Sequence, residues 1–351
     1  MGIKTGIMPI NIASRYRYVL SLCALLCLAV LSGCDQPETP GEQPSAPIAE
    51  PISDLTRQAW NHYHINGVDI ISQPVACIAL CKQTITRLIQ SPTQELLDTA
   101  RSQIKTCKET YLATKLFTAA NQATQNKLVQ LHQRINSTLE MPGFVDSVKS
   151  YPYSGIVNDT SIALSKKTLI SEHGTADSDT ISLGFSVIEF LLWGEHLYDD
   201  SIEPRSLESL TAISAWPPQA VKLGLNELDI SEHANNRRRR YLELALLILE
   251  SDLNQLATVW NKNTLPPLNK AAAAPIKQNI INHLSRNLDT VTLDVLLPLF
   301  TDSTTSDGQL AATPFSQWLG IANDESFNLL LNDATPVATK QKSLASLIKA
   351  I

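Results

Sequence analysis

Residues 183–194 read Leu-Gly-Phe-Ser-Val-Ile-Glu-Phe-Leu-Leu-Trp-Gly. Apolar side chains occupy nearly every angle around a helix of this sequence, so we predict a helix that is buried on all sides. Ser186 and Glu189 are its only polar side chains, and Trp193 and His196 fall on the same face at 100° per residue. A buried carboxylate must be paired, hydrogen-bonded or protonated. Glu189 is therefore expected to be either a member of an ion pair or a ligand.

The rest of the chain also has a helical composition. Its 351 residues include only 13 glycines, and 44% of them are hydrophobic, which favours long helices over a disordered chain. No strand-like alternation persists long enough to form a sheet. The formal net charge of -6 argues against a nucleic-acid-binding protein, whose surface would be basic. We therefore predict an all-α protein that does not bind nucleic acid.

Turn-forming residues predict how the helical domain is divided. Residues 141–180 are rich in Pro, Gly, Ser, Thr and Asp and are expected to form an irregular crossing. We predict a helical domain over residues 53–351, with bundle-like halves at about 53–140 and 181–351 on either side of this crossing. Within the first half, Gly67 and Pro74 are expected to break or kink the first helix.

The N-terminal residues have the pattern of a targeting segment. Residues 1–33 contain a positive region and then an apolar stretch too short to span a bilayer comfortably. They lead to Cys34 through Leu-Ser-Gly-Cys, which resembles a bacterial lipobox, in which the Cys is lipidated. Residues 34–52 hold five prolines and four acidic residues, which indicates an extended tether. We expect a lipid-anchored, periplasm-facing envelope protein; a plain secretory signal is the alternative, and the choice of inner or outer membrane stays open.

Three cysteines follow Cys34 in the chain, namely Cys77, Cys81 and Cys107, which is an odd number in an oxidising compartment. Ser91-Pro92 marks the expected apex of an antiparallel helical hairpin, and Cys77 and Cys107 are equally far from it. We prefer a disulfide between these two, with Cys81 as a buried free thiol. The pairing Cys81–Cys107 is the near alternative, and three buried thiols are the third interpretation.

The stretch around Glu189 resembles the signature of the imelysin family of envelope proteins, Gly-x-His-x-x-Glu followed by an apolar Leu-Leu-Trp-Gly run. Other stretches resemble family elements in order and spacing, namely Leu88–Phe117, Phe144-Val145-Asp146, Tyr151-Pro152, Asn158-Asp159 and Arg237–Leu242. The resemblance covers about residues 54–262. It implies an all-α fold of two four-helix-bundle-like halves and a role near bacterial iron uptake. Some members were first classed as metallopeptidases.

Two positions depart from the family pattern. Ser186 stands where the family has its motif His, and Lys115 stands where members tend to carry a Glu after a Tyr-x-x-Thr element. Because a hydroxyl is a poor ligand for a transition metal, we expect an ammonium to have replaced the metal beside Glu189, with Lys115 as its source. His196 is a second candidate metal ligand, but about 10 Å of helix separates it from Glu189 unless the helix unwinds at Gly194.

The motif residues Gly184, Ser186 and Glu189 therefore predict no catalytic set. We expect a non-enzymatic envelope lipoprotein, a binding or accessory component of metal (iron) uptake with a degenerate metal site. Its partners would be the membrane, through Cys34, and iron-transport components. A divalent metal or iron is the one cofactor that the resemblance implies. The alternatives are an imelysin-type metallopeptidase with Glu189 as general base and a polymer- or protein-binding scaffold.

Other polar groups give weaker signals. The Arg237–Arg240 run is expected to begin a solvated helix face that pairs with acids such as Glu232 and Glu243. His132 and His283 each stand alone on otherwise ordinary helices.

Overall fold

The helical periodicity of the sequence is realised almost throughout the computed structural model, which describes residues 50–351 except 121, 176–178, 264–268, 288–292, 303–309 and 333. Residues 49–351 form one compact unit. The predicted signal segment, Cys34 and the tether up to residue 49 lie outside the described residues. Among the described residues, β-structure is limited to an isolated bridge and the antiparallel pair β1 (Thr301–Asp302) and β2 (Ala311–Ala312). The all-α prediction is confirmed.

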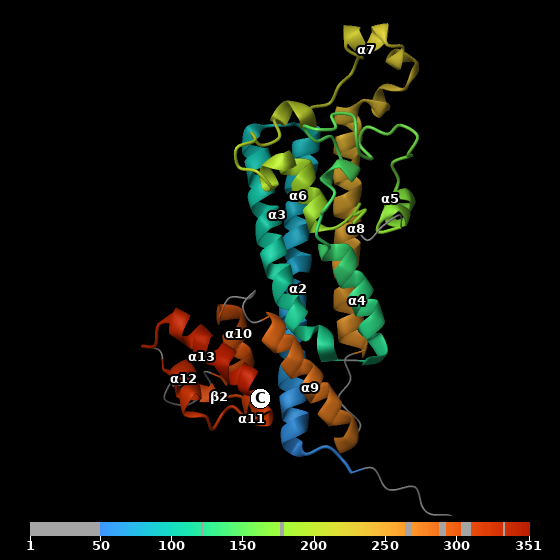
Figure 1. The fold of residues 1–351 in the computed structure, drawn as a ribbon. Helices are drawn as coiled ribbons and strands as arrows, with labels where there is room; N and C mark the ends of the chain where they lie inside the picture. The colour runs from blue at the N-terminus through green and yellow to red at the C-terminus, as the bar shows by residue number, and fades with distance from the viewer. Residues whose placement is uncertain are drawn as a thin grey trace, which may run out of the picture. The chain divides into compact units, whose positions relative to one another are not determined.

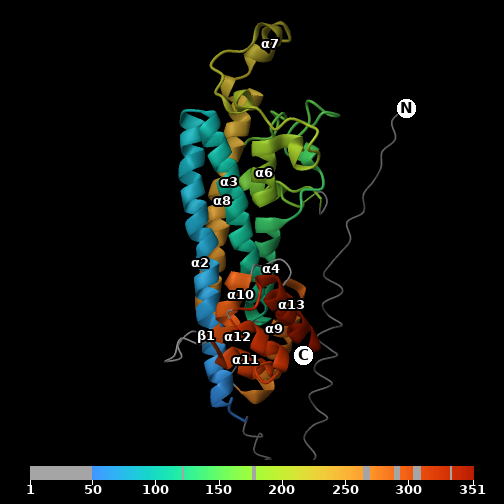
Figure 2. The ribbon, with the colours of Figure 1, turned by 90° about the vertical axis from the view of Figure 1, so that its left-hand side faces the viewer.

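The helices form two groups along the chain (Figures 1 and 2). The first group contains α2 (Asp54–Gln90), α3 (Gln94–Thr114), α4 (Gln122–Asn136), α6 (Phe185–Trp193) and α8 (Ala234–Asn263). The second contains α9 (Lys270–Asn287), α10 (Leu293–Phe300), α11 (Pro314–Leu319), α12 (Asn328–Leu331) and α13 (Val337–Ala350). Short helices α5 (Lys166–Glu172) and α7 (Pro218–Lys222) lie in the connections between α4 and α8.

The first helix is continuous through Gly67 and Pro74, where a break or kink was expected. Ser53 caps α2 by accepting from the Thr56 backbone N–H, and the helix runs to Gln90 through both positions. Gly67 is explained by packing, because a Cβ there would lie 2.4 Å from Cζ2 of Trp260 on α8. The glycine therefore allows two long helices to approach closely.

The α2–α3 hairpin agrees with the predicted cysteine register. Cys77 and Cys107 form a disulfide with their Cα atoms 5.4 Å apart, and Cys81 is a buried free thiol. The cap of α3 is Thr93, whose hydroxyl accepts from the Leu96 backbone N–H. The preferred pairing is thus the one present in the structure.

The expected division into halves at 53–140 and 181–351 is wrong. Helix α8 follows the crossing yet packs against α2 and α4, and α11 packs against α2. Helix α9 packs against η2 (Lys115–Ala120), the 3₁₀ helix that follows α3. The reason is length: α2 and α8 have 37 and 30 residues, or about 55 and 45 Å. They can therefore contact helices from both sides of the crossing, as Figure 1 shows.

The arginine run at the start of α8 is also more buried than expected. Arg237 is 2% and Arg238 5% exposed, so a solvated face is wrong for these two. Arg237 pairs with Glu232, and Arg240 forms the expected surface pair with Glu243 at 3.0 Å. The Arg237 guanidinium also donates to crossing carbonyls, those of Ile156, Val157, Asp159 and Ile162. The run therefore anchors the crossing to α8.

Candidate functional site

Helix α6 carries the motif and is buried as its composition predicts. Its N-cap is Gly184, with φ +95°. A Cβ at this position would lie 2.6 Å from the Ile135 carbonyl oxygen on α4. Only glycine combines this left-handed backbone with so close an approach. The first motif residue thus places the start of α6 directly against the end of α4.

Ser186, at the position of the family's His, bonds to backbone. Its Oγ donates to the Ser137 carbonyl oxygen at 3.0 Å, just after α4 ends. This bond joins α6 to the α4 terminus. Because the hydroxyl proton is directed at that carbonyl, the side chain is held as a structural donor.

Glu189, one turn further along α6, is paired with an ammonium, but Lys108 supplies it and not Lys115. The Lys108 Nζ donates to Oε2 of Glu189 at 2.5 Å. The two side chains are 29% and 13% exposed. Lys115 was the wrong partner because it lies seven residues beyond Lys108, about 10 Å along a helix axis. It also begins η2 instead of continuing α3.

The ion pair lies in a cleft of about 280 Å³ between α3, α6 and the segment after α4. Tyr198 donates to the Leu139 carbonyl oxygen across this cleft at 3.1 Å. Burial, with the charges of Glu189 and Glu140, raises the pKa of Tyr198 to about 12. The cleft is lined by Lys108, Thr138, Leu139, Ser186, Glu189, Leu197 and Tyr198. Its charged groups are therefore one cation and one anion that already neutralise each other.

His196 is not brought into this cleft. Helix α6 ends at Trp193, and Gly194 takes φ +67°, so the continuous helical face expected through His196 is interrupted. The Nδ1 atom of His196 lies 2.8 Å from the Ile202 carbonyl oxygen, a contact within the turn itself. Glu189 and His196 therefore do not line the same cleft.

The side chains present do not fit a metal centre at this motif. The carboxylate is paired with an ammonium, and the hydroxyl donates to a carbonyl. In the part of the chain that the structure describes, no three His, Cys, Asp or Glu side chains are grouped so that they could hold a metal ion. A transition-metal site normally needs several such ligands, so we derive no chemistry through a metal here.

The imelysin family model matches residues 75–308. The chain belongs to the imelysin family. No curated protein matches the chain. The family match includes Lys108, the crossing and the whole of α6, whereas α11, α12 and α13 lie beyond it.

A second group of charged side chains, Asp146 with Arg205 and Arg238, lies within the residues that match the imelysin model and was not predicted from the sequence. Asp146 of the crossing is fully buried and pairs with Arg205 at 3.0 Å and Arg238 at 2.5 Å. Burial opposes ionisation of Asp146, but the two guanidinium charges outweigh it and hold its pKa below the ordinary value. Arg205 also lies 5.7 Å from the centre of the Phe190 ring. These contacts therefore hold the crossing against α6 and α8. Arg205 could not be identified from the sequence because it lies in no local motif.

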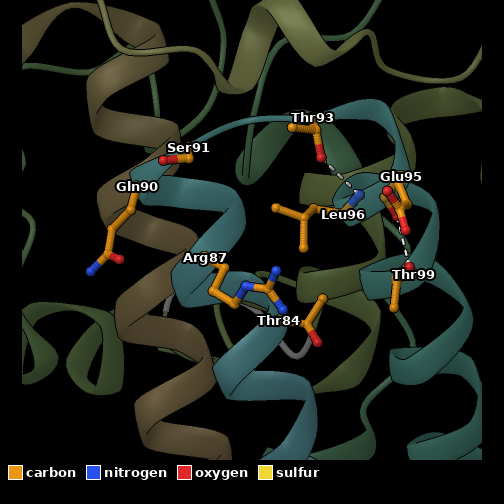
Figure 3. A pocket seen from close by; sticks show the side chains of 8 residues that line it. All are labelled: Thr84, Arg87, Gln90, Ser91, Thr93, Glu95, Leu96 and Thr99. Carbon is orange, nitrogen blue, oxygen red and sulfur yellow. Dashed lines mark hydrogen bonds between the residues drawn. The ribbon is translucent and has the colours of Figure 1, made fainter.

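A larger hollow, of about 560 Å³, lies at the α2–α3 apex of this imelysin chain (Figure 3). Two of its hydroxyls bond to helix backbone: Thr93 caps α3, and Thr99 donates to the Glu95 carbonyl oxygen at 2.7 Å. Arg87 and Glu95 are exposed. Because no buried charged group faces this hollow, we place the candidate site at Glu189.

Proposed function

We propose that this imelysin-family protein is a non-enzymatic cell-envelope lipoprotein, a binding or accessory component associated with metal (iron) uptake. In this proposal the Lys108–Glu189 ion pair occupies the place of a metal in the family motif. The observation that carries it is the 2.5 Å contact between Lys108 Nζ and Glu189 Oε2, together with a hydroxyl at position 186.

The charge of the site supports this proposal. A buried carboxylate needs a partner, and a metal ion or an ammonium can each supply one positive neighbour. With Lys108 in contact, a metal at Glu189 would either lie beside the ammonium charge or displace it, and a displaced ammonium would be left partly buried and unpaired. That exchange costs the desolvation of a charge. The resting pair therefore opposes metal binding.

The same contact argues against the peptidase alternative. A metallopeptidase uses a metal to lower the pKa of bound water and a free carboxylate as general base. Glu189 is the only carboxylate lining the described cleft, and its Oε2 accepts from Lys108. A polymer- or protein-binding scaffold stays an alternative that the experiment below can favour.

The envelope location rests on residues 1–52. The apolar segment that ends at Cys34 and the acidic, proline-rich tether after it support a lipid anchor. The 18 residues that follow Cys34, residues 35–52, could hold the helical unit about 50 Å from a membrane surface if they were extended as polyproline II.

The proposal is tested by rebuilding a donor set. Ser186→His with Lys108→Glu would place an imidazole and two carboxylates at the cleft, and we expect this variant to gain Zn²⁺ or Fe²⁺ binding in equilibrium dialysis. Ser186→His with Lys105→Glu is the matched control, because Lys105 is exposed on the same helix. Equal metal binding by the parent, the control and the double variant would contradict a degenerate site.

A further inference from the structure

The hollow of about 560 Å³ at the α2–α3 apex (Figure 3) carries two opposite charges that do not pair. Arg87 comes from the last turn of α2, and Glu95 comes from the first turn of α3. Within the residues that the structure describes, neither side chain forms an ion pair or a hydrogen bond. The volume is in the range of small-molecule sites.

The position of each charge is explained by its helix end. A cation is stabilised in the last turn of a helix and an anion in the first turn, so Arg87 and Glu95 are each favoured where they lie. This stabilisation uses neither the guanidinium N–H groups nor the carboxylate oxygens. Because both side chains are exposed, these donors and acceptors are open to a ligand in the hollow.

A buried hydroxyl in the same wall also lacks a protein partner. Thr84 lies three residues before Arg87 on α2, on the same helix face, and is only 9% exposed. Its hydroxyl forms no hydrogen bond within the described residues, and the oxygen keeps contact with solvent. Since Thr84 lines the hollow, the oxygen is reached from there. Buried polar groups are normally satisfied, so this hydroxyl indicates a polar ligand.

An apolar side chain lies between the two charges. In Figure 3 the Leu96 side chain is drawn between Arg87 on α2 and Glu95 on α3. Leu96 is partly buried against the core and lines the hollow. A ligand lying across it would present carbon to Leu96 and opposite charges at its two ends.

We propose that this hollow binds a small zwitterion, a free amino acid or a short peptide. Its carboxylate pairs with the Arg87 guanidinium, which can donate two parallel hydrogen bonds, and also accepts from the Thr84 hydroxyl. Its ammonium pairs with the Glu95 carboxylate, and its carbon atoms pack on Leu96. A simple anion would leave Glu95 facing a like charge, and a simple cation would do the same to Arg87. The site is independent of the proposed function, because the Glu189 cleft shares no residue with this hollow.

Isothermal titration calorimetry at pH 7 with the full chain in non-ionic detergent tests the proposal. The probes are leucine, leucyl-alanine and leucyl-alanyl-alanine. Each is compared with its N-acetylated form, which lacks the ammonium, and with its C-terminal amide, which lacks the carboxylate. We expect saturable binding of at least one zwitterion and at least tenfold weaker binding of both blocked forms, as when a charged hydrogen-bond partner is removed.

The three probes also distinguish the sources of the ligand. Binding of leucine identifies a free amino acid, whereas binding of the peptides alone identifies a peptide. Failure of all three probes, or a blocked form that binds as tightly as its zwitterion, would overturn the proposal and leave the ion pair at Glu189 unaffected.

Variants assign each end of the ligand to its partner. Arg87→Gln should weaken zwitterion binding by about tenfold and remove the preference over the C-terminal amide. Glu95→Gln should remove the preference over the N-acetylated form, and Thr84→Val should weaken binding without changing either preference. Arg57→Gln and Glu109→Gln are the controls, because both residues are exposed on the same two helices and do not line the hollow.

Thermal melting checks that each variant folds. Zwitterion binding that is unchanged in any of the three hollow variants, or lost equally in the controls, would contradict the site. Preferences for both free ends that survive in Arg87→Gln and Glu95→Gln would contradict the orientation of the ligand.

Discussion

Glu189→Gln should destabilise the protein by leaving Lys108 partly buried and unpaired. Removing one partner of a fully buried ion pair costs about 3–5 kcal/mol. Here Glu189 and Lys108 are 13% and 29% exposed, so solvent screens part of that cost. We expect a loss of about 2 kcal/mol in the free energy of unfolding.

The double variant Glu189→Gln with Lys108→Met should recover much of this loss, because no charge then remains in the cleft. The assay is urea unfolding by far-ultraviolet circular dichroism under non-reducing conditions, with the midpoint and slope compared. Glu243→Gln is the matched control: Glu243 and Arg240 are 48% and 55% exposed, and a change within about 0.5 kcal/mol is expected. A Glu189→Gln cost no larger than the control, or a double variant no more stable than the single one, would refute the reasoning.

Three further predictions concern the hairpin, a buried histidine and the anchor. Replacing Cys77 and Cys107 with Ser should lower the free energy of unfolding by about 3–4 kcal/mol in the chain-entropy model, and peptide mapping that finds both thiols free would contradict the pairing. Because the His132 pKa falls from 6.5 to about 3 on folding, the unfolded chain binds more protons between these values, so stability should fall as pH falls through that range. His132→Gln should therefore lose about 2 kcal/mol less than the parent between pH 7 and pH 5, measured by urea unfolding, and an identical pH dependence would argue against it. Cys34→Ala should accumulate as precursor and leave the membrane fraction; a variant that stays membrane-bound would exclude lipidation as the anchor.

The pairing of Cys77 with Cys107 could be predicted because it depends on one local quantity, the position of the hairpin apex. Two helices that leave a common turn keep equal heights, and α2 and α3 do so from Gln90 and Gln94. The disulfide follows from counting residues on each side of that turn.

The partner of Glu189 could not be predicted in the same way. The choice between Lys108 and Lys115 depends on how far α6 is shifted along α3, and 70 residues of chain, 115–184, separate the two helices. Gly184 sets this shift by its close approach to α4, a contact that periodicity does not reveal. The sequence did identify the motif, the buried carboxylate and the type of its partner.

The continuity of α2 and the Asp146 group depend on distant contacts in the same way. Gly67 would weaken an isolated helix, but Trp260 packs on it from α8, so the apparent breaker is a packing site. Arg205 reaches Asp146 across 59 positions of chain, and neither residue lies in a pattern that specifies the other.

The metal content of the unmodified protein tests the central claim most directly. Protein purified from cells grown with added iron and zinc would be analysed by inductively coupled plasma mass spectrometry, beside Glu189→Gln prepared in parallel. An ammonium at the motif carboxylate predicts iron and zinc far below one atom per chain in both samples, with no difference between them. Stoichiometric iron or zinc in the parent that is lost on Glu189→Gln would contradict the account and assign the motif to a metal.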